Sequence, residues 1–300
     1  MRAAGCLSGR RRAPRWRRRP RASARPRPRD AAPLVRARRL EHRAEVAARR
    51  AVSAAPPRRI VSLVPSTTES VCAFGAGDRL VGCTRYCVEP AAALVGIARI
   101  GGTKNPKREA IAALEPDLVL ANAEENRAED LAWLAARVPV LAQTPRTVAE
   151  AVAALGELAG ALGVGAEQAT LVARAVAAPV APARPLRAYY AIWRKPWMTV
   201  SGDTFLHDVM AQCGFANVAA DAAARYPEMA PDEAVARGVE VVLLASEPWA
   251  FDDAQREELA NARAFGDARV VLCDGRDFSW HGVRVAAGLA GGRRLRAQLG

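Results

Sequence analysis

A short segment near the carboxyl end of the chain gathers side chains that can bind a metal or an anion. In Trp280-His-Gly-Val-Arg284, the His281 imidazole could ligate a metal or hydrogen-bond a ligand, and the Arg284 guanidinium could hold a carboxylate or phosphate. The alternative for His281 is an ordinary hydrogen-bonding group in a loop. A bare Zn²⁺ site needs several histidine ligands. Only two histidines follow residue 57, so we expect no protein metal site.

Tryptophans are concentrated in the second half of the chain. Aromatic residues make up only 5% of the sequence, yet Trp193, Trp197, Trp249 and Trp280 all fall beside prolines or after apolar stretches, where we expect loops. Flat rings suit a large planar ligand, and indole NH or phenol OH groups can orient it. The alternative is packing in the core, which we expect for about half of these rings.

The sequence carries little that indicates catalysis. It contains no HExxH, GxSxG or P-loop pattern. Asp203 and His207 are four residues apart and could share one helix face as an acid/base pair, but no nucleophile stands beside them. We therefore expect a protein that is not an enzyme. An enzyme or intracellular carrier on the same fold, with Asp203 and His207 as its acid/base pair, is the alternative.

The candidate site residues must be positioned by the rest of the chain, in which buried strands alternate with helices. This alternation is typical of α/β proteins whose sheets are mostly parallel and covered by helices on both faces. The expected strands are 59–64, 80–83, 118–121, 139–142, 187–192, 241–245 and 270–273. The expected helices follow a capping box at Ser66–Glu69 and span 107–114, 126–136, 204–213, 231–237 and a last segment from about residue 282.

Between the two sets of strands, residues 147–178 show a long alanine-rich helical pattern that Gly163 and Gly165 interrupt. We therefore expect an α/β protein with two similar Rossmann-like lobes, 58–145 and 187–300. A helical connector, 146–186, joins them, and prolines such as Pro179 shorten it. A helical connector resists hinge bending, so the lobes should open only slightly.

One pattern occurs twice. Glu109-Ala-Ile-Ala-Ala-Leu-Glu-Pro-Asp117 precedes the apolar stretch 118–121, and Asp232-Glu-Ala-Val-Ala-Arg-Gly-Val-Glu240 precedes the apolar stretch 241–245. Each copy reads as an acid-led short helix, a turn and a buried strand. Two lobes built from one repeated unit usually bind a ligand where they meet.

The charge is divided unevenly along the chain. The whole sequence carries +13 and residues 1–57 carry +15, which leaves −2 for the rest. We expect 1–57 to be a disordered basic extension, either artefactual or a targeting segment, with no specific nucleic-acid partner. Its longest apolar stretch, Ala31–Val35, is too short for a secretory signal, and no transmembrane segment is apparent.

Arg59-Ile-Val-Ser-Leu-Val-Pro-Ser-Thr-Thr-Glu69, the 109–121 segment and the two-lobe layout resemble the class III periplasmic binding proteins. These are the vitamin B12 and iron–siderophore receptors of ABC importers. The second lobe is similar to their helical-backbone metal receptor branch through its segments 193–200, 225–228, 247–249 and 280–284. The resemblance covers residues 58–300. It implies a monomeric solute receptor that holds a corrinoid or metal chelate between its lobes, with no cofactor of its own.

The resemblance also assigns roles to particular residues. It implies that Glu109 and Asp232 dock to arginines of a membrane permease, although acids in a first helical turn also favour the helix dipole. It implies ligand contacts at Tyr86 and Tyr226. Thr103 and Asn122 depart from the pattern, since the B12 receptors carry tryptophan there. The family is periplasmic or attached to the cell surface; without a recognisable signal segment, a cytoplasmic location is the alternative.

Overall fold

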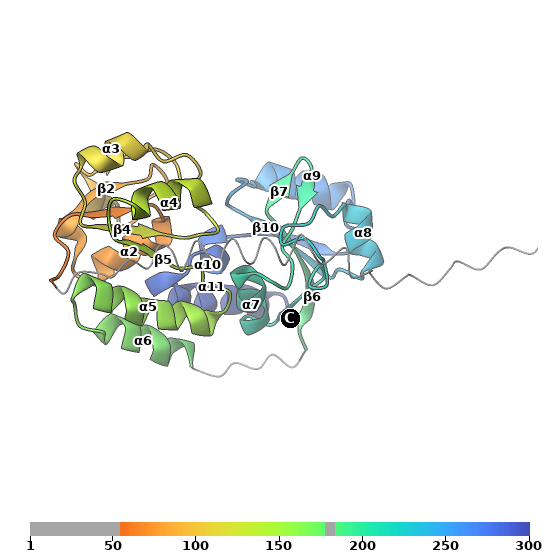
Figure 1. The fold of residues 1–300 in the computed structure, drawn as a ribbon. Coiled ribbons are helices and arrows are strands. Elements are labelled where there is room, and N and C mark those ends of the chain that lie inside the picture. The colour runs from red at the N-terminus through yellow and green to blue at the C-terminus, as the bar shows by residue number, and fades with distance from the viewer. Residues whose placement is uncertain (1–54, 178–183) are drawn as a thin grey trace, which may run out of the picture. The chain divides into compact units, whose positions relative to one another are not determined.

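The computed structural model describes residues 55–177 and 184–300. The predicted basic extension therefore lies outside the described residues except for its last three, and so does Pro179 in the connector. Two sheets, each built of parallel strands, lie on either side of a group of helices (Figure 1). Within the described ranges, no helix is long and apolar enough to cross a membrane.

The first lobe holds a parallel sheet with the strand order β3-β2-β1-β4-β5. Its strands are short, and all except the edge strand β3 are mostly buried because helices cover both faces of the sheet. The strands are β1 (Ile60–Ser62), β2 (Leu80–Cys83), β3 (Ala98–Arg99), β4 (Leu118–Ala121) and β5 (Val140–Ala142), and the helices are α2 (Pro65–Ala73), α3 (Arg108–Ala113) and α4 (Ala128–Ala135), with 3-10 turns η1 (Gly77–Arg79) and η2 (Ala91–Leu94).

The second lobe repeats this arrangement in the strand order β11-β10-β6-β9. Its elements are β6 (Leu186–Ala191), the hairpin β7 (Trp193–Arg194) and β8 (Trp197–Met198), α7 (Phe205–Gln212), β9 (Phe215–Asn217), α8 (Pro231–Ala236), β10 (Val241–Ala245), α9 (Asp253–Asn261) and β11 (Arg269–Cys273). Reversed, the order β9-β6-β10-β11 matches β2-β1-β4-β5 strand for strand. The predicted repeat is therefore present in the topology: α3 precedes β4 as α8 precedes β10.

The connector consists of α5 (Val148–Leu162) and α6 (Glu167–Val176), and Gly163 ends α5 in a left-handed conformation (φ 63°). The chain ends with α10 (Gly275–Ser279), the 3-10 turn η3 (Gly282–Arg284) and α11 (Val285–Gln298). These last elements return to the connector, since η3 contacts α2, α5 and α6, and α11 contacts α6. The connector and the C-terminal segment therefore pack against each other, and η3 also joins them to α2 of the first lobe.

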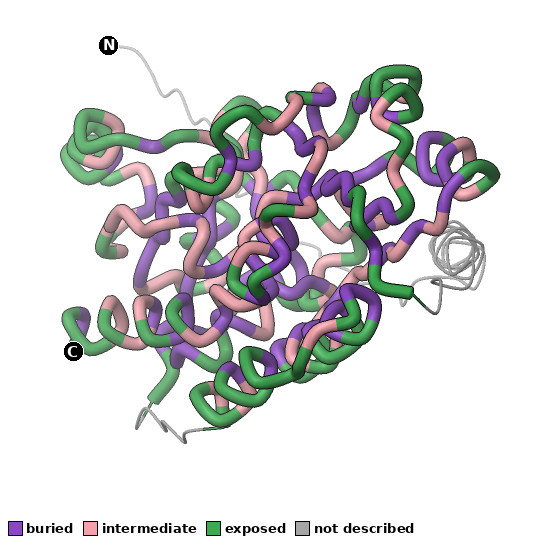
Figure 2. The backbone as a smooth tube through the Cα atoms, turned by 90° about the vertical axis from the view of Figure 1, so that its left-hand side faces the viewer, coloured by how far each residue is buried: buried purple, intermediate pink, exposed green. Residues whose placement is uncertain are grey.

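A shared hydrophobic core supports this linkage. One cluster of buried side chains runs through both sheets and the connector, including Leu120, Leu158, Tyr190 and Leu289, while each sheet has a separate cluster beneath its outer helices. Buried backbone threads through both lobes and the helices between them (Figure 2). A continuous core opposes large lobe rotation, because separating packed side chains exposes apolar surface to water.

The capping-box prediction was wrong. Helix α2 begins at Pro65, one residue before Ser66, and no side chain caps it. Proline is favoured at the first position of a helix, because its missing N–H needs no partner there. Ser66 and Glu69 lie inside the helix, and the Glu69 carboxylate instead pairs with Arg284.

Candidate functional site

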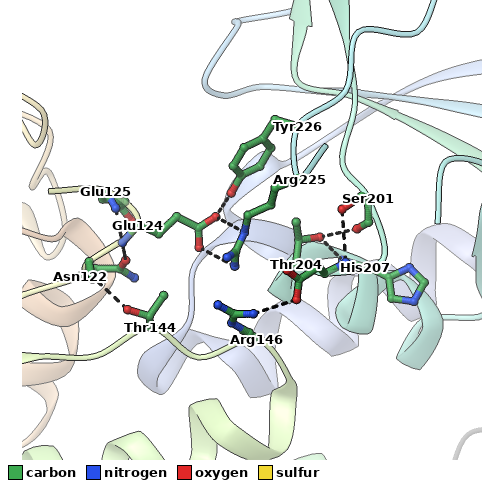
Figure 3. Close-up of polar contacts among 12 residues, drawn as sticks. Asn122, Glu124, Glu125, Thr144, Arg146, Ser201, Thr204, His207, Arg225 and Tyr226 are labelled. Atoms are coloured by element: carbon green, nitrogen blue, oxygen red, sulfur yellow. Dashed lines mark hydrogen bonds and ion pairs between the residues drawn. The ribbon is translucent and has the colours of Figure 1, made fainter. Parts of the chain in front are cut away.

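The loops that follow the strands of both sheets meet each other. In the first lobe these loops carry Asn122 and Glu124 after β4 and Arg146 after β5, and in the second Arg225 and Tyr226 follow β9 (Figure 3). Asp203 follows the hairpin strand β8. All strands within each sheet are parallel, so their carboxyl ends lie along one edge. In open α/β sheets this edge is where ligands bind.

A carboxylate–guanidinium pair crosses between the lobes (Figure 3). Glu124 Oε1 lies 2.9 Å from Arg225 Nε, and Glu124 Oε2 accepts a hydrogen bond of 3.1 Å from Arg225 Nη2. The Tyr226 hydroxyl also donates to Glu124. Both charged side chains are largely withdrawn from water, with exposed fractions of 21% for Glu124 and 17% for Arg225. A second pair, Arg146–Asp203 at 2.9 Å, spans the same boundary.

Side-chain hydrogen bonds hold the Glu124 loop in place. Asn126 Oδ1 accepts a bond of 2.9 Å from the Asn122 backbone N–H, and Asn122 Oδ1 accepts one of 2.7 Å from the Glu124 N–H. Asn126 also donates to the Thr103 carbonyl oxygen over 2.9 Å. Asparagine favours such turns because its amide can replace backbone partners. The loop therefore presents Glu124 in one orientation.

His281 lies buried where the two lobes and the connector meet. Its Nε2 is 3.3 Å from Ser66 Oγ and 3.3 Å from Asn122 Nδ2, both in the first lobe. An amide NH₂ only donates, so with this amide assignment Nε2 is the acceptor and the proton sits on Nδ1. Burial lowers the pKa of His281 to about 4, which keeps the ring neutral near pH 7.

The Glu69–Arg284 pair lies beside His281. Arg284 donates from Nε over 2.9 Å and from Nη2 over 2.6 Å to the two carboxylate oxygens of Glu69 on α2. Gly282 has a φ of 88°, and a Cβ there would lie 2.3 Å from Ser70 Oγ. Glycine is therefore required for this close approach. Arg284, predicted to hold a ligand anion, already binds a protein carboxylate.

Acidic side chains gather at the same edge. Glu247 Oε1 accepts hydrogen bonds from Trp280 Nε1 (2.7 Å) and Ser279 Oγ (2.8 Å). Burial, chiefly, and the neighbouring Glu124 carboxylate raise the pKa of Glu125 to about 7, while the Lys104 ammonium opposes this shift. Glu125 is therefore partly protonated at neutral pH, unlike an ordinary surface carboxylate.

The predicted aromatic residues divide into exposed and packed rings. Trp193 is 38% exposed and meets the Trp249 ring edge-on, with centroids 4.9 Å apart. Trp197 stacks on Phe251 at 6.0 Å and contacts Phe265 edge-on at 5.4 Å, so it packs against the second-lobe core. Trp193 and Trp197 lie on the two strands of a hairpin, not in loops as expected.

The remaining predicted contacts fall on either side of the lobe boundary. Tyr86 is 52% exposed in the first lobe, beside Gly102, and Tyr226 is 38% exposed in the second. Trp280 is buried, and the Arg284 guanidinium lies 5.1 Å from its ring centroid. The structure therefore places exposed rings on both lobes and uses Trp280 and Arg284 in internal contacts.

The two acids predicted to dock lie at equivalent positions. Glu109 is in the first turn of α3 and Asp232 in the first turn of α8, and both are exposed. Because both helices run antiparallel to the strands they precede, their first turns lie toward the edge where the lobes meet. The matched strand orders give these carboxylates the same place in each lobe.

Asp203 and His207 do not lie on one helix face, contrary to the prediction. Asp203 precedes the N-cap residue Thr204, and α7 begins only at Phe205. The Asp203 carboxylate pairs with Arg146, whereas His207 Nδ1 lies 3.5 Å from Asn217 Nδ2. Thr204 ends the preceding loop because its hydroxyl accepts from the His207 N–H, a typical helix cap.

The periplasmic binding protein family model matches residues 60–274, which includes both sheets and the loops between them. The chain belongs to this family. It is 29% identical over 194 residues to the vitamin B12-binding protein of Yersinia pestis (strain Pestoides F), an alignment that covers 62% of this chain and 69% of the relative.

Two solved structures share the fold of this periplasmic binding protein. The periplasmic vitamin B12 binding protein BtuF of Vibrio cholerae superposes with a TM-score of 0.66 and 22% identity, over 81% of this chain and 98% of that one. The periplasmic heme binding protein HutB of Vibrio cholerae superposes with a TM-score of 0.67 and 17% identity. This superposition covers 80% of this chain and 98% of that one. The predicted two-lobed α/β fold and the family resemblance are confirmed.

Sequence reasoning missed several residues of the lobe boundary in this periplasmic binding protein. Glu124, Glu125 and Arg146 were not singled out as site residues, and Arg225 and Glu247 were noted only as parts of motifs. The available signal was the polar run Asn122-Ala-Glu-Glu-Asn126 directly after a buried strand. Such residues at the carboxyl end of a strand mark a site in α/β folds.

A bare metal centre finds no support in the described part of the chain, where no three His, Cys, Asp or Glu side chains are grouped to hold an ion. The proposed metal ligand His281 uses Nε2 for hydrogen bonds to Ser66 and Asn122. Metal ligation at Nε2 requires a free lone pair, so these bonds must break before Nε2 can bind a metal.

Proposed function

We propose that this chain is the solute receptor of an ABC importer and holds a corrinoid or a metal chelate between its lobes. The observation that carries the proposal is the pairing of two equivalent sheets at their carboxyl edges, with exposed rings on both sides. The family, and relatives named for vitamin B12 and heme binding, support this ligand class. The receptor is not an enzyme under this proposal and has no cofactor of its own.

The rings at the boundary suit a flat, largely apolar ligand. Tyr86 approaches from the first lobe, and Trp193, Trp249 and Tyr226 from the second. Aromatic faces give large contact area with little loss of conformational entropy. Arg225 and Glu124 add a cation and an anion that can turn from each other to polar groups of the ligand, such as carboxylates or amides.

The departures from the B12-receptor pattern bear on the choice of ligand. Thr103 and Asn122 stand where those receptors carry tryptophan, and Asn122 is engaged with His281 and the Glu124 loop. A site with two fewer indoles offers less flat surface for a corrin ring. We therefore place a metal chelate such as haem or a ferric siderophore beside cobalamin as a candidate.

The experiment is calorimetric titration of the full chain with cyanocobalamin, cobinamide, haemin and ferrichrome. One of them should bind with a Kd in the micromolar range or tighter, and Trp193→Ala and Tyr86→Ala should each weaken binding about tenfold, the loss of about 1.4 kcal/mol. Trp133→Ala, on α4, is the matched control and should leave the Kd unchanged. Absence of heat with all four compounds overturns the proposed ligand class.

Transport requires a membrane partner, and we propose that Glu109 and Asp232 dock a monomeric receptor to the permease from the periplasmic or outer face of the membrane. Exposed carboxylates on two rigid lobes can meet two basic pockets at a fixed spacing. The test is stimulation of the reconstituted importer's ATPase. Glu109→Ala and Asp232→Ala should each reduce it without changing ligand affinity, whereas Glu129→Ala on α4 should not.

A further inference from the structure

Two buried cysteines lie under the loop that carries Tyr86. Cys83 is the last residue of β2, and Cys87 follows four residues later, after a turn closed by a hydrogen bond from the Cys87 N–H to the Thr84 carbonyl. Both side chains have 0% exposure, and both thiols are free. Neither takes part in the lobe contacts described above.

Hydrogen-bonding groups surround the Cys87 sulfur. Thr68 Oγ1, on α2, lies 3.0 Å from Cys87 Sγ, and Thr84 Oγ1 lies 3.1 Å from it. The Cys83 thiol, as the largest cause, and the Thr68 and Thr84 hydroxyls lower the pKa of Cys87 to about 6, while burial opposes this shift. The Thr68 hydroxyl proton is shared, because Ser62 Oγ and the Val64 carbonyl oxygen each lie 2.8 Å from the same Oγ1.

A single guanidinium fixes the pair. Arg99 Nη1 donates to Cys83 Sγ over 3.0 Å, to the Cys87 carbonyl over 2.7 Å and to the Thr84 carbonyl over 3.2 Å. Arg99 lies on β3, which is paired with β2. The cation therefore holds the strand end, the turn and both cysteines in one arrangement. Its charge opposes, without reversing, the rise in the pKa of Cys83 that Cys87 and burial cause.

We propose that Cys83 and Cys87 form a redox-active dithiol that closes to an intramolecular disulfide. The Cys87 thiolate attacks one sulfur of a disulfide oxidant and releases one thiolate. Cys83 gives its proton to that thiolate and attacks Cys87 Sγ, which releases the second thiolate. Two electrons pass from the protein to the oxidant, which becomes a dithiol or two thiols.

Cys213 and Cys273 lack this arrangement. Burial raises the pKa of Cys213 to about 12, and its thiol donates a hydrogen bond of 3.8 Å to the Leu289 carbonyl oxygen. Burial also raises the pKa of Cys273, helped by the nearby Asp274 carboxylate. A protonated thiol is a poor nucleophile, so these residues should react slowly.

The dithiol is placed to affect the site. The turn between the cysteines carries Tyr86, and Glu89, two residues after Cys87, lies 3.4 Å from Arg276 of the second lobe. Disulfide formation removes the thiols that Thr68 and Arg99 now bind, so the loop must adjust. Arg85, Tyr86 and Val88 beside the cysteines are exposed, so an oxidant can approach the turn from solvent, and it reaches Cys87 only when the hydrogen bonds from Arg99 to the turn open.

The test is peptide mapping of the full chain after equilibration in glutathione buffers of increasing oxidised fraction, with acid quenching and alkylation. Trypsin cuts after Arg79, Arg85 and Arg99, so Cys83 and Cys87 fall in separate peptides, 80–85 and 86–99. The disulfide should join these two peptides, and reductant should separate them. No ligand is needed, so the result is independent of the proposed transport function.

Two variants identify the order of attack. Cys83→Ser should trap glutathione on Cys87, whereas Cys87→Ser should leave Cys83 unmodified; Cys213→Ser should behave as wild type. The proposal is overturned if peptides 80–85 and 86–99 remain separate and alkylated in the most oxidising buffer. It is also overturned if each cysteine of the wild-type chain carries its own glutathione, or if Cys72 pairs with Cys87. The wild-type map decides these outcomes even if a variant does not fold.

Discussion

Glu124 and Arg225 are 101 residues apart in the chain, yet the Glu124 carboxylate and the Arg225 guanidinium meet at 2.9 Å across the boundary between the lobes. Each is held by its own lobe: Glu124 by the asparagine turn after β4, and Arg225 by the segment between β9 and α8. The ion pair can therefore form only when the two lobes are in contact. A ligand that enters between the lobes must compete with it.

A double-mutant cycle on Glu124→Gln and Arg225→Gln should give a coupling energy of about 1–3 kcal/mol in urea unfolding, because both side chains are mostly shielded from water. The control is the surface pair Arg127–Glu129, whose atoms are 3.8 Å apart and whose side chains are 54% and 66% exposed. This pair should show no measurable coupling. Equal coupling in the two cycles would mean that Glu124–Arg225 does not hold the lobes.

Glu125 should make stability depend on pH. Its folded pKa is about 7, above the ordinary value of 4.5, so folding favours the protonated acid. The resulting contribution is fully present below pH 4.5 and is lost as the pH rises through 7, a change on the order of 2–3 kcal/mol. Glu125→Gln should therefore flatten the decline in unfolding free energy between pH 5 and 8.

The measurement is urea unfolding at half-unit steps of pH. Glu129→Gln, on the exposed side of α4, removes a carboxylate of the same type and controls for net charge. If Glu125→Gln and the wild type lose the same unfolding free energy between pH 5 and 8, the folded-state pKa of Glu125 does not lie in this range.

The fold could be predicted because its signals are local. Buried strands such as 118–121 and 241–245 are apolar throughout, and the helices before them carry an acid in their first turn, so both lobes and their repeat are visible in the sequence. Helix α9 was missed because Asp253–Asn261 is polar, with Leu259 its only buried residue. An apolar periodicity cannot reveal a helix that buries one side chain.

The site was less predictable because its contacts join distant parts of the chain. Ser66 and His281 are 215 residues apart, and neither sequence neighbourhood indicates that they meet. Residue types predicted ligand contacts for Arg284 and Trp280 but gave no sign that these side chains pair with Glu69 and Glu247. Arginine and tryptophan serve equally in ligand sites and in internal pairs, so only their three-dimensional partners distinguish the two.

Trp193 and Trp197 should respond differently to alanine substitution. Trp197 packs against Phe251 and Phe265, so Trp197→Ala should lower the unfolding free energy by about 3–5 kcal/mol. Trp193 is 38% exposed, and its substitution should cost only about 1 kcal/mol. Urea unfolding followed by circular dichroism checks both values. Similar losses would show that Trp193 is also a core residue, and would weaken its proposed role in ligand binding.

Glu69→Gln should destabilise the protein by about 2–4 kcal/mol, because Arg284 then keeps its charge in a mostly buried place without a carboxylate. Both side chains are 19% exposed, and their two hydrogen bonds join α2 to the segment before α11. Adding Arg284→Met should recover part of this loss, since the double variant buries no unpaired charge. Urea unfolding of both single variants and the double variant tests this. If the double variant loses as much unfolding free energy as the two single variants together, the two residues do not act as a pair. The link between the first lobe and the last helix must then rest on the packing around Gly282.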